Sequence, residues 1–493
     1  MKKSKVFLLA TVGLLSVGVL TACSSSSKTS GKTYNYVYGG DPATLDYVST
    51  NKKNMTTAVS NGVDGLFEND QYGNLKPSVA ENWSVSQDGL TYTYKIRKGV
   101  KWYTSDGEEY ANVTAKDFVT GLKHAADTNS EAIYLLQNSV KGLNDYLSGA
   151  NKDFSNVGIK AVDDYTLQYT LSQPEPYWNS KLTYSVTWPV NEDFLKSKGK
   201  DFGKSTDPTS ILYNGPYLLK SLTTKSSIEF TKNENYWDKD NVYFDTVKLT
   251  YDDGTDQESL ERNFTDGVYN LARLYPTSSN YSKVEKQYKD NIFYTQPGAA
   301  VEGVGINIDR QTYDHTSKEN DQQKTSTKTA LLNKDFRQAL GFAIDRTNYA
   351  AQLNGKEGGS TAVRNIFVKP DFVQADGKDF GTMVMDQLPA YGDEWSGVNL
   401  ADSQDGLYNP EKAKAEFAKA KEALQAEGVQ FPIHLDVPVN QSNKIFVNQV
   451  QSLKQSIESA LGKDNVVLDL HQLSTDDFYN ITYSASNAAA EDW

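Results

Sequence analysis

The chain has 493 residues, of which 38% are hydrophobic and 12% aromatic; this length predicts about three domains of roughly 150 residues each, and the aromatic content excludes a disordered chain. The four histidines are scattered and only one cysteine is present, which excludes an internal disulfide and multi-cysteine metal sites and argues against a histidine-rich metal enzyme. The net charge of −13 argues against a nucleic-acid binder and against electrostatic adhesion to anionic lipid.

The amino-terminal segment has the organisation of a secretory signal. Three lysines open the chain, and residues 6–20 are apolar but fewer than the about 20 residues that cross a bilayer. Residues 20–23 read Leu-Thr-Ala-Cys and resemble the bacterial lipobox, in which the cysteine is acylated and the chain is cut before it. We therefore expect a signal peptide over 1–22, lipidation at Cys23, and a tether over 23–32 that anchors the protein to the extracellular face of the cell membrane. The alternative is an ordinary secretory signal with a chance cysteine.

Short alternating stretches and helix signals follow. Alternating β-prone residues predict strands at 34–38, 90–97, 227–232 and 246–251. A helix is predicted to begin after Thr114, because threonine caps helices and an aspartate three residues later can complete a capping box. The polar residues 315–330 are expected to form an excursion on the surface. A short helix is predicted over 336–346.

The last third of the chain has the clearest pattern. A helix is predicted from Pro410 to about residue 426, because proline suits the first turn of a helix and Gly428 follows its end. The elements expected after it are a strand at 431–437, a helix capped by residues 440–442 and running to about 461, and a strand at 466–470. Strand, helix and strand in this order predict a βαβ unit with parallel pairing and a right-handed crossover.

Motifs that carry catalysis are not matched. Residues 199–205 imitate a phosphate-binding loop, but three residues separate the glycines where the motif needs four. The chain has no nucleophile elbow, and residues 238–240 lack the glycine and final glutamate of a calcium loop. With 63 acidic residues, neighbouring carboxylates are explained by a solvated surface. The pattern therefore favours a ligand-binding protein, in which some aromatic side chains would line a cleft.

Several motifs in order resemble one family. The matching stretches are residues 75–83, 88–102, 106–107, 113–118, 214–217, 233–238 and 336–346. Together they resemble the signature of family 5 extracellular solute-binding proteins, which serve ABC importers for peptides, dipeptides and nickel. The resemblance spans about residues 34–470. Residues 256–264 and 272–276 look most like the oligopeptide-binding lipoproteins of streptococci and lactococci.

The resemblance implies a fold and a function. The expected fold is mixed α/β, of the type II periplasmic-binding-protein kind, with lobe I at 33–64 and 190–299, lobe II inserted at 65–189 and lobe III at 300–493. Lobes I and III would close over a peptide, as in periplasmic binding proteins generally. The implied function is capture of extracellular oligopeptides and their delivery to the permease subunits of an ABC transporter. The implied protein is a monomer without catalytic residues, cofactor or metal.

The resemblance also implies ligand contacts. The positions that match contacts of family members are Asn51, Lys53, Gly303, Gly305, Asn440 and Asn443, and Tyr134 on the lobe II side is a weaker candidate. Asn440 agrees with an independent rule, because ligands of open α/β sheets lie beyond the carboxyl ends of the strands. Glycine at 303 and 305, where some relatives carry larger residues, would let a ligand backbone approach closely. The alternative is that these are ordinary turn residues.

Other functions stay open. A binder of peptide pheromones, or less plausibly of nickel or haem, would share the fold, and a secreted hydrolase is disfavoured by the missing motifs. In the family, a segment beyond the position of Trp493 helps to hold the peptide amine and then returns to lobe I. On this resemblance lobe III is expected to be incomplete in the 493-residue chain. The chain is therefore expected to bind peptide less well than a longer form would.

Overall fold

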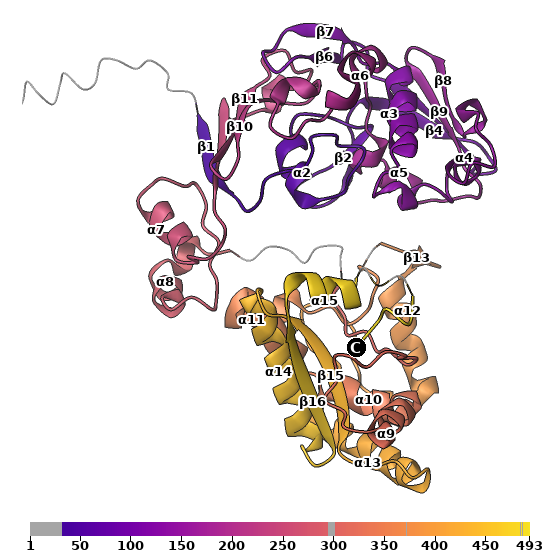
Figure 1. The fold of residues 1–493 in the computed structure, drawn as a ribbon, viewed down its shortest axis with the longest axis vertical. Coiled ribbons are helices and arrows are strands. Elements are labelled where there is room, and N and C mark those ends of the chain that lie inside the picture. The colour runs from indigo at the N-terminus through magenta and orange to yellow at the C-terminus, as the bar shows by residue number, and fades with distance from the viewer. Residues whose placement is uncertain (1–31, 294–300, 371, 484, 486) are drawn as a thin grey trace, which may run out of the picture. The chain divides into compact units, whose positions relative to one another are not determined.

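The fold is known from a computed structural model and consists of two compact units (Figure 1). The residues described are 32–293, 301–370, 372–483, 485 and 487–493. Unit 1 ends at Ala272, and unit 2 runs from Arg273 to Trp493. The division falls before the boundary between lobes I and III that was expected at residue 299. Among the described helices, none combines the length and the apolar character needed to cross a membrane.

One sheet of unit 1 joins strands that are distant in sequence. Its order is β1 (Thr33–Tyr38), β12 (Thr246–Tyr251), β11 (Ser227–Lys232) and β10 (Tyr217–Thr223). Strand β1 runs parallel to β12, and the other neighbours are antiparallel. The strands predicted at 34–38, 227–232 and 246–251 are confirmed, because alternation of β-prone residues reports a sheet with one buried face.

A second sheet of unit 1 is antiparallel and rich in aromatic residues. Its order is β4 (Ala80–Val85), β5 (Thr91–Ile96), β9 (Thr166–Thr170) and β8 (Ile159–Asp163). On its buried face Tyr94 and Tyr169 pack edge to face, with ring centroids 6.3 Å apart. Trp178 packs on Tyr169 at 5.2 Å. Much of the aromatic content therefore forms the core of unit 1.

Helix α3 (Ala115–Asp127) packs near this sheet and begins as predicted. Thr114 and Asp117 form the capping box. The carboxylate of Asp117 accepts hydrogen bonds from the backbone N–H of Thr114 at 2.8 Å and from Nε1 of Trp102 at 3.2 Å. The remaining helices and strands of unit 1 are α2 (Lys53–Val59), β2 (Phe67–Asn69), β3 (Leu75–Pro77), β6 (Lys101–Tyr103), β7 (Glu109–Asn112), α4 (Leu143–Leu147), α5 (Trp178–Lys181), α6 (Glu192–Lys198) and α7 (Ser259–Thr265).

Unit 2 is built on the predicted βαβ element. Strand β15 (Ile433–Asn440) pairs in parallel with β16 (Val466–Leu473), and α14 (Lys444–Leu461) connects them. Helix α13 (Pro410–Ala426) has the predicted bounds and packs against α10 (Lys334–Ala343). Leucines, phenylalanines and alanines from these helices and strands form a core of their own. The other helices and strands of unit 2 are α8 (Tyr281–Gln287), α9 (Asp321–Leu332), α11 (Arg346–Gly359), β13 (Gln374–Ala375), β14 (Lys378–Asp379), α12 (Phe380–Gln387) and α15 (Thr475–Ile481).

Three predictions for unit 2 were wrong in detail. The helix predicted to reach residue 346 ends at Ala343, because Ile344 and Asp345 are extended and Asp345 caps α11. The cap of α14 is Asn443, which follows the predicted residues 440–442. The segment 315–330 is more than a surface excursion, because it contains most of α9, and although many of its residues are exposed it buries Lys318 and Thr327. These two side chains are buried because they bond to β15.

Candidate functional site

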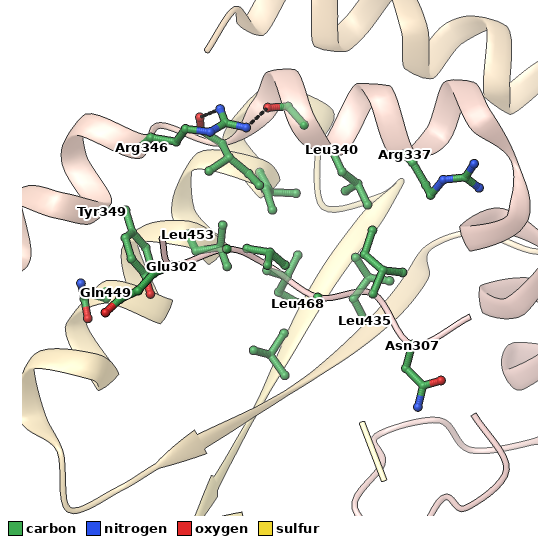
Figure 2. Close-up of a pocket in the computed structure, with 18 of the residues that line it drawn as sticks. Glu302, Asn307, Arg337, Leu340, Arg346, Tyr349, Leu435, Gln449, Leu453 and Leu468 are labelled. Atoms are coloured by element: carbon green, nitrogen blue, oxygen red, sulfur yellow. Dashed lines mark hydrogen bonds between the residues drawn. The ribbon is translucent and has the colours of Figure 1, made fainter. Parts of the chain in front are cut away.

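Unit 2 contains a cavity of about 760 Å³. Its walls come from α10, α11, α14, both strands of the parallel pair and the segment 301–308. Figure 2 shows the apolar part, where the side chains of Leu340, Leu435, Leu453 and Leu468 surround the space that this segment crosses. A mostly apolar cavity with a few polar groups at its margin has the general character of a ligand site.

Polar and charged side chains also line the cavity. They include Glu302, Asn307, Arg337, Arg346 and Tyr349, all labelled in Figure 2. The guanidinium of Arg346 donates to the carbonyl oxygens of Ile344 and Gly341, each at 3.2 Å. The side-chain nitrogen of Asn307 is buried and has no hydrogen-bond partner among the described residues. The cavity thus holds an amide donor that the rest of the described structure leaves unused.

The segment 301–308 is the unusual wall of this cavity. Its residues belong to no helix or strand, and three of its large apolar side chains, Val304, Ile306 and Ile308, are exposed. Among the described residues, the backbone of 301–306 forms no hydrogen bond. Because backbone N–H and C=O groups require partners, this segment offers an unpaired row of donors and acceptors beside an apolar cavity.

Gly303 and Gly305, two of the predicted contacts, lie on this segment and line the cavity. A Cβ atom added to Gly305 would lie 3.1 Å from the ring of Trp493, and one added to Gly303 would lie 3.4 Å from the ring of Phe367. Neither glycine has a positive φ, so backbone conformation does not require glycine here, and space is tight at Gly305 but ordinary at Gly303. Both positions leave the backbone of the segment uncovered by a side chain.

A buried ionic cluster fixes the chain that follows the segment. The carboxylate of Asp436 accepts hydrogen bonds from Arg310 at 2.6 Å and from His471 at 2.8 Å, and it is paired with Lys318. Burial alone would raise the pKa of Asp436, but the bonds from Lys318 and from the backbone of Ser317 hold it well below its usual range. The cluster therefore ties residues 310–318 to β15 and supports one end of the cavity wall.

The predicted contacts in unit 1 lie on two segments that the structure brings together. Asn51 and Lys53 are exposed, and Lys53 is the first residue of α2. The side chain of Glu131 accepts a hydrogen bond from Thr50, and its backbone N–H donates to the carbonyl of Ser49 at 3.0 Å. Tyr134, three residues after Glu131, is 58% exposed. These three predicted residues therefore lie close to one surface region, and their contact with a ligand stays a prediction.

Asn440 and Asn443 do not line the cavity. The side-chain oxygen of Asn443 accepts the backbone N–H of Phe446 at 3.0 Å, which makes it the cap of α14. The side-chain oxygen of Asn440 accepts from the backbone of Ser442 at 3.0 Å and from Thr475 at 3.2 Å. Asn440 does end β15, as expected, but both side chains have structural roles. Their contact with a ligand is not tested, and Cys23 lies outside the described residues.

Some residues of the cavity were not anticipated. Glu302 and Asn307 flank the predicted glycines. Apolar residues alternate with other residues over 301–308, and this strand-like pattern could have indicated that both side chains belong to the same extended segment. Tyr349 and Arg337 come from helices whose sequence reads as ordinary amphipathic pattern. Their shared position depends on how three helices pack, which a local pattern does not report.

Comparisons with known proteins give a consistent result. A family model described as bacterial extracellular solute-binding proteins, family 5 Middle, matches residues 74–481. The chain is 68% identical over 496 aligned residues to the oligopeptide-binding protein AmiA of Streptococcus pneumoniae, covering 100% of the chain and 75% of that protein. It is 61% identical to the oligopeptide-binding protein SarA of Streptococcus gordonii, over 100% of the chain and 76% of that protein.

A solved structure shows the same fold at low identity. The pheromone receptor PrgZ, whose structure was determined for its mode of peptide binding, is 21% identical with a TM-score of 0.60. The match covers 91% of this chain and 78% of that one. The expected mixed α/β fold of the binding-protein kind is thereby confirmed.

Proposed function

Because the chain belongs to the bacterial extracellular solute-binding proteins of family 5, we propose that it captures oligopeptides outside the cell and delivers them to the permease of an ABC transporter. The relatives that are 68% and 61% identical are both named oligopeptide-binding proteins. We propose that the protein acts as a monomer, that it binds peptides without cleaving them, and that it needs neither cofactor nor metal.

The unpaired backbone of residues 301–306 carries this proposal. An extended peptide has N–H and C=O groups along its whole length, and these can pair with protein backbone as an added strand. Gly303 and Gly305 would let the peptide approach this backbone without a side chain between them. Such pairing ignores the identity of the peptide's side chains, which suits a protein that accepts many sequences.

The proposal is tested by the ligands that the protein retains. The purified protein is denatured in mild acid, and the released molecules are identified by mass spectrometry, with a mock purification as control. A mixture of short, uncleaved peptides is the expected result. A single metal complex, or fragments that accumulate from one added peptide over time, would contradict peptide capture without catalysis.

We further propose that Cys23 is acylated after removal of a signal peptide and that the lipid holds the protein at the membrane. Two acyl chains contribute about 0.8 kcal/mol per buried CH₂, which suffices for stable anchoring. Cys23→Ala is therefore expected to release the protein into the medium, while the neighbouring Ser24→Ala leaves it in the membrane fraction. Equal membrane fractions for the two variants would show that another feature anchors the protein.

Specific capture of a peptide pheromone is a second candidate, favoured by the fold match to a pheromone receptor. The two functions differ in how strongly affinity depends on peptide sequence.

A further inference from the structure

The carboxyl ends of β15 and β16 carry an aromatic cluster outside the cavity. We call it the aromatic platform, and its members are Phe446 of α14, Phe478 and Tyr479 of α15, and Tyr483. The ring of Phe478 lies 5.7 Å from that of Phe446 and 6.2 Å from that of Tyr483, and the two tyrosine rings are 5.7 Å apart. Helix α15 is visible at this end of the two strands in Figure 1.

The two tyrosines of the platform contact neighbouring rings and are open to solvent. Phe478 is buried, whereas Tyr479 is 47% exposed and Tyr483 is 81% exposed. Their ring distances are typical of favourable aromatic pairs. Two aromatic rings at the carboxyl edge of parallel strands lie where ligands of open α/β sheets bind.

One carboxylate of α15 lies beside the platform. Asp476 precedes Tyr479 by three residues, which places the two side chains on the same face of α15. Among the described residues, Asp476 forms no ion pair, and its side chain is exposed.

Exposed aromatic rings beside a carboxylate favour a positively charged ligand group. The faces of aromatic rings carry negative potential and attract cations within about 6 Å of the ring centroid. The carboxylate of Asp476 adds to that potential in the same direction. A guanidinium fits better than an ammonium, because it is planar, can stack on a ring and is more weakly hydrated.

We propose that the aromatic platform, with Asp476, is a subsite for an arginine side chain of a bound peptide. The inference rests on the proposed function, since it needs a peptide as ligand. It adds a preference to a backbone-directed site: the backbone pairing accepts any sequence, and the platform favours peptides that place arginine near the carboxyl edge of β15 and β16.

The test compares peptides that differ only in this charge. Alanine-based hexapeptides with one arginine, scanned along the sequence, are titrated by calorimetry against the same peptides with citrulline, which has the same shape without charge. For at least one position the arginine peptide is expected to bind about five- to tenfold more tightly at low salt, and the difference is expected to shrink as salt rises. The preference is expected to persist when the peptide amino terminus is acetylated.

Variants locate the preference. Tyr483→Ala and Asp476→Asn should each reduce the difference between arginine and citrulline peptides at least threefold, while the citrulline peptide binds as before. Tyr391→Ala is the matched control, because Tyr391 is a tyrosine of the same unit that is 60% exposed. Circular dichroism checks that each variant is folded.

The outcomes separate this inference from the proposed function. If no hexapeptide binds at all, the proposed function itself fails. If arginine and citrulline peptides bind equally well at every position, peptide binding stands and the platform is not a cation subsite. A preference that disappears on acetylation would show that the peptide amine is the bound cation, and one that survives Tyr483→Ala would place the arginine elsewhere; either result overturns the assignment.

Discussion

Gly305 shows how one missing side chain shapes the candidate site. A Cβ atom there would come within 3.1 Å of the Trp493 ring, and a larger side chain would also stand over the unpaired backbone. Gly305→Val is therefore expected to weaken binding of an unbiased peptide mixture about tenfold, measured by calorimetry. Gly39→Ala is the control, since a Cβ atom there would meet only an ordinary contact at 3.7 Å. Unchanged affinity in a folded Gly305→Val protein would show that peptide does not approach this segment.

Asp64 gives unit 1 a predictable dependence on pH. Its buried carboxyl accepts a hydrogen bond from the hydroxyl of Tyr236 at 2.8 Å, and Asn214 bonds both to its backbone N–H and to its carbonyl oxygen. Burial raises the pKa of Asp64 from 3.8 to about 7. Between these two values the unfolded chain has lost the proton while the folded protein keeps it. The stability contributed by this group is therefore complete below about pH 4 and is lost as the pH rises through 7.

Asp64→Asn tests that dependence. Each pH unit within the window changes the free energy of unfolding by up to about 1.4 kcal/mol, so the wild type should lose stability between pH 5 and pH 8 relative to the variant. Chemical denaturation at both pH values, followed in unit 1 by hydrogen exchange, measures the difference. Asp106→Asn, at a side chain that is 70% exposed, should keep the wild-type dependence. If Asp64→Asn also keeps it, the carboxyl of Asp64 is ionised in the folded protein.

At the scale of elements, the role of Asn443 follows from its position as the cap of α14. Loss of a helix cap costs about 0.5–2 kcal/mol, so Asn443→Ala should lower the stability of unit 2 by that amount, whereas Asn443→Ser should retain most of it. Because the side chain of Asn443 is occupied by the backbone of Phe446, peptide affinity should stay within about twofold for both variants. A large loss of affinity in a protein of normal stability would confirm Asn443 as a ligand contact.

The elements also show which sequence signals can be trusted. Helix α13 and the parallel pair were predictable, because Pro410, Gly428 and the apolar runs act locally. The burial of Lys318 and Thr327 was not predictable. Lys318 looks solvated in sequence, and only its contact with Asp436 on β15, more than a hundred residues away, allows it to be buried. Polar residues whose partners are distant in sequence carry no local signal.

At the scale of the molecule, the fold was predictable from the family resemblance, whereas the candidate site was predictable in part. Gly303 and Gly305 were identified and line the cavity. The side chain of Asn443 turned out to serve its own helix. Tyr349 and the aromatic platform were not predicted. Tyr349 lines a cavity, and the platform joins rings of α14 and α15, and in both cases the elements concerned meet only in the folded unit. Sequence motifs identify the family. The structure is needed to determine which side chains lie together around a ligand.

The central claim is that the protein holds peptides mainly by their backbone, and calorimetry on scrambled peptides of one length tests it most directly. Five peptides with the same composition and unrelated order are titrated at one pH and one salt concentration. The account predicts that all five bind and that their binding free energies agree within about 1–2 kcal/mol, which is about five- to thirtyfold in affinity. Binding of one sequence alone, with the others weaker by several orders of magnitude, would contradict it and indicate a receptor for a specific peptide.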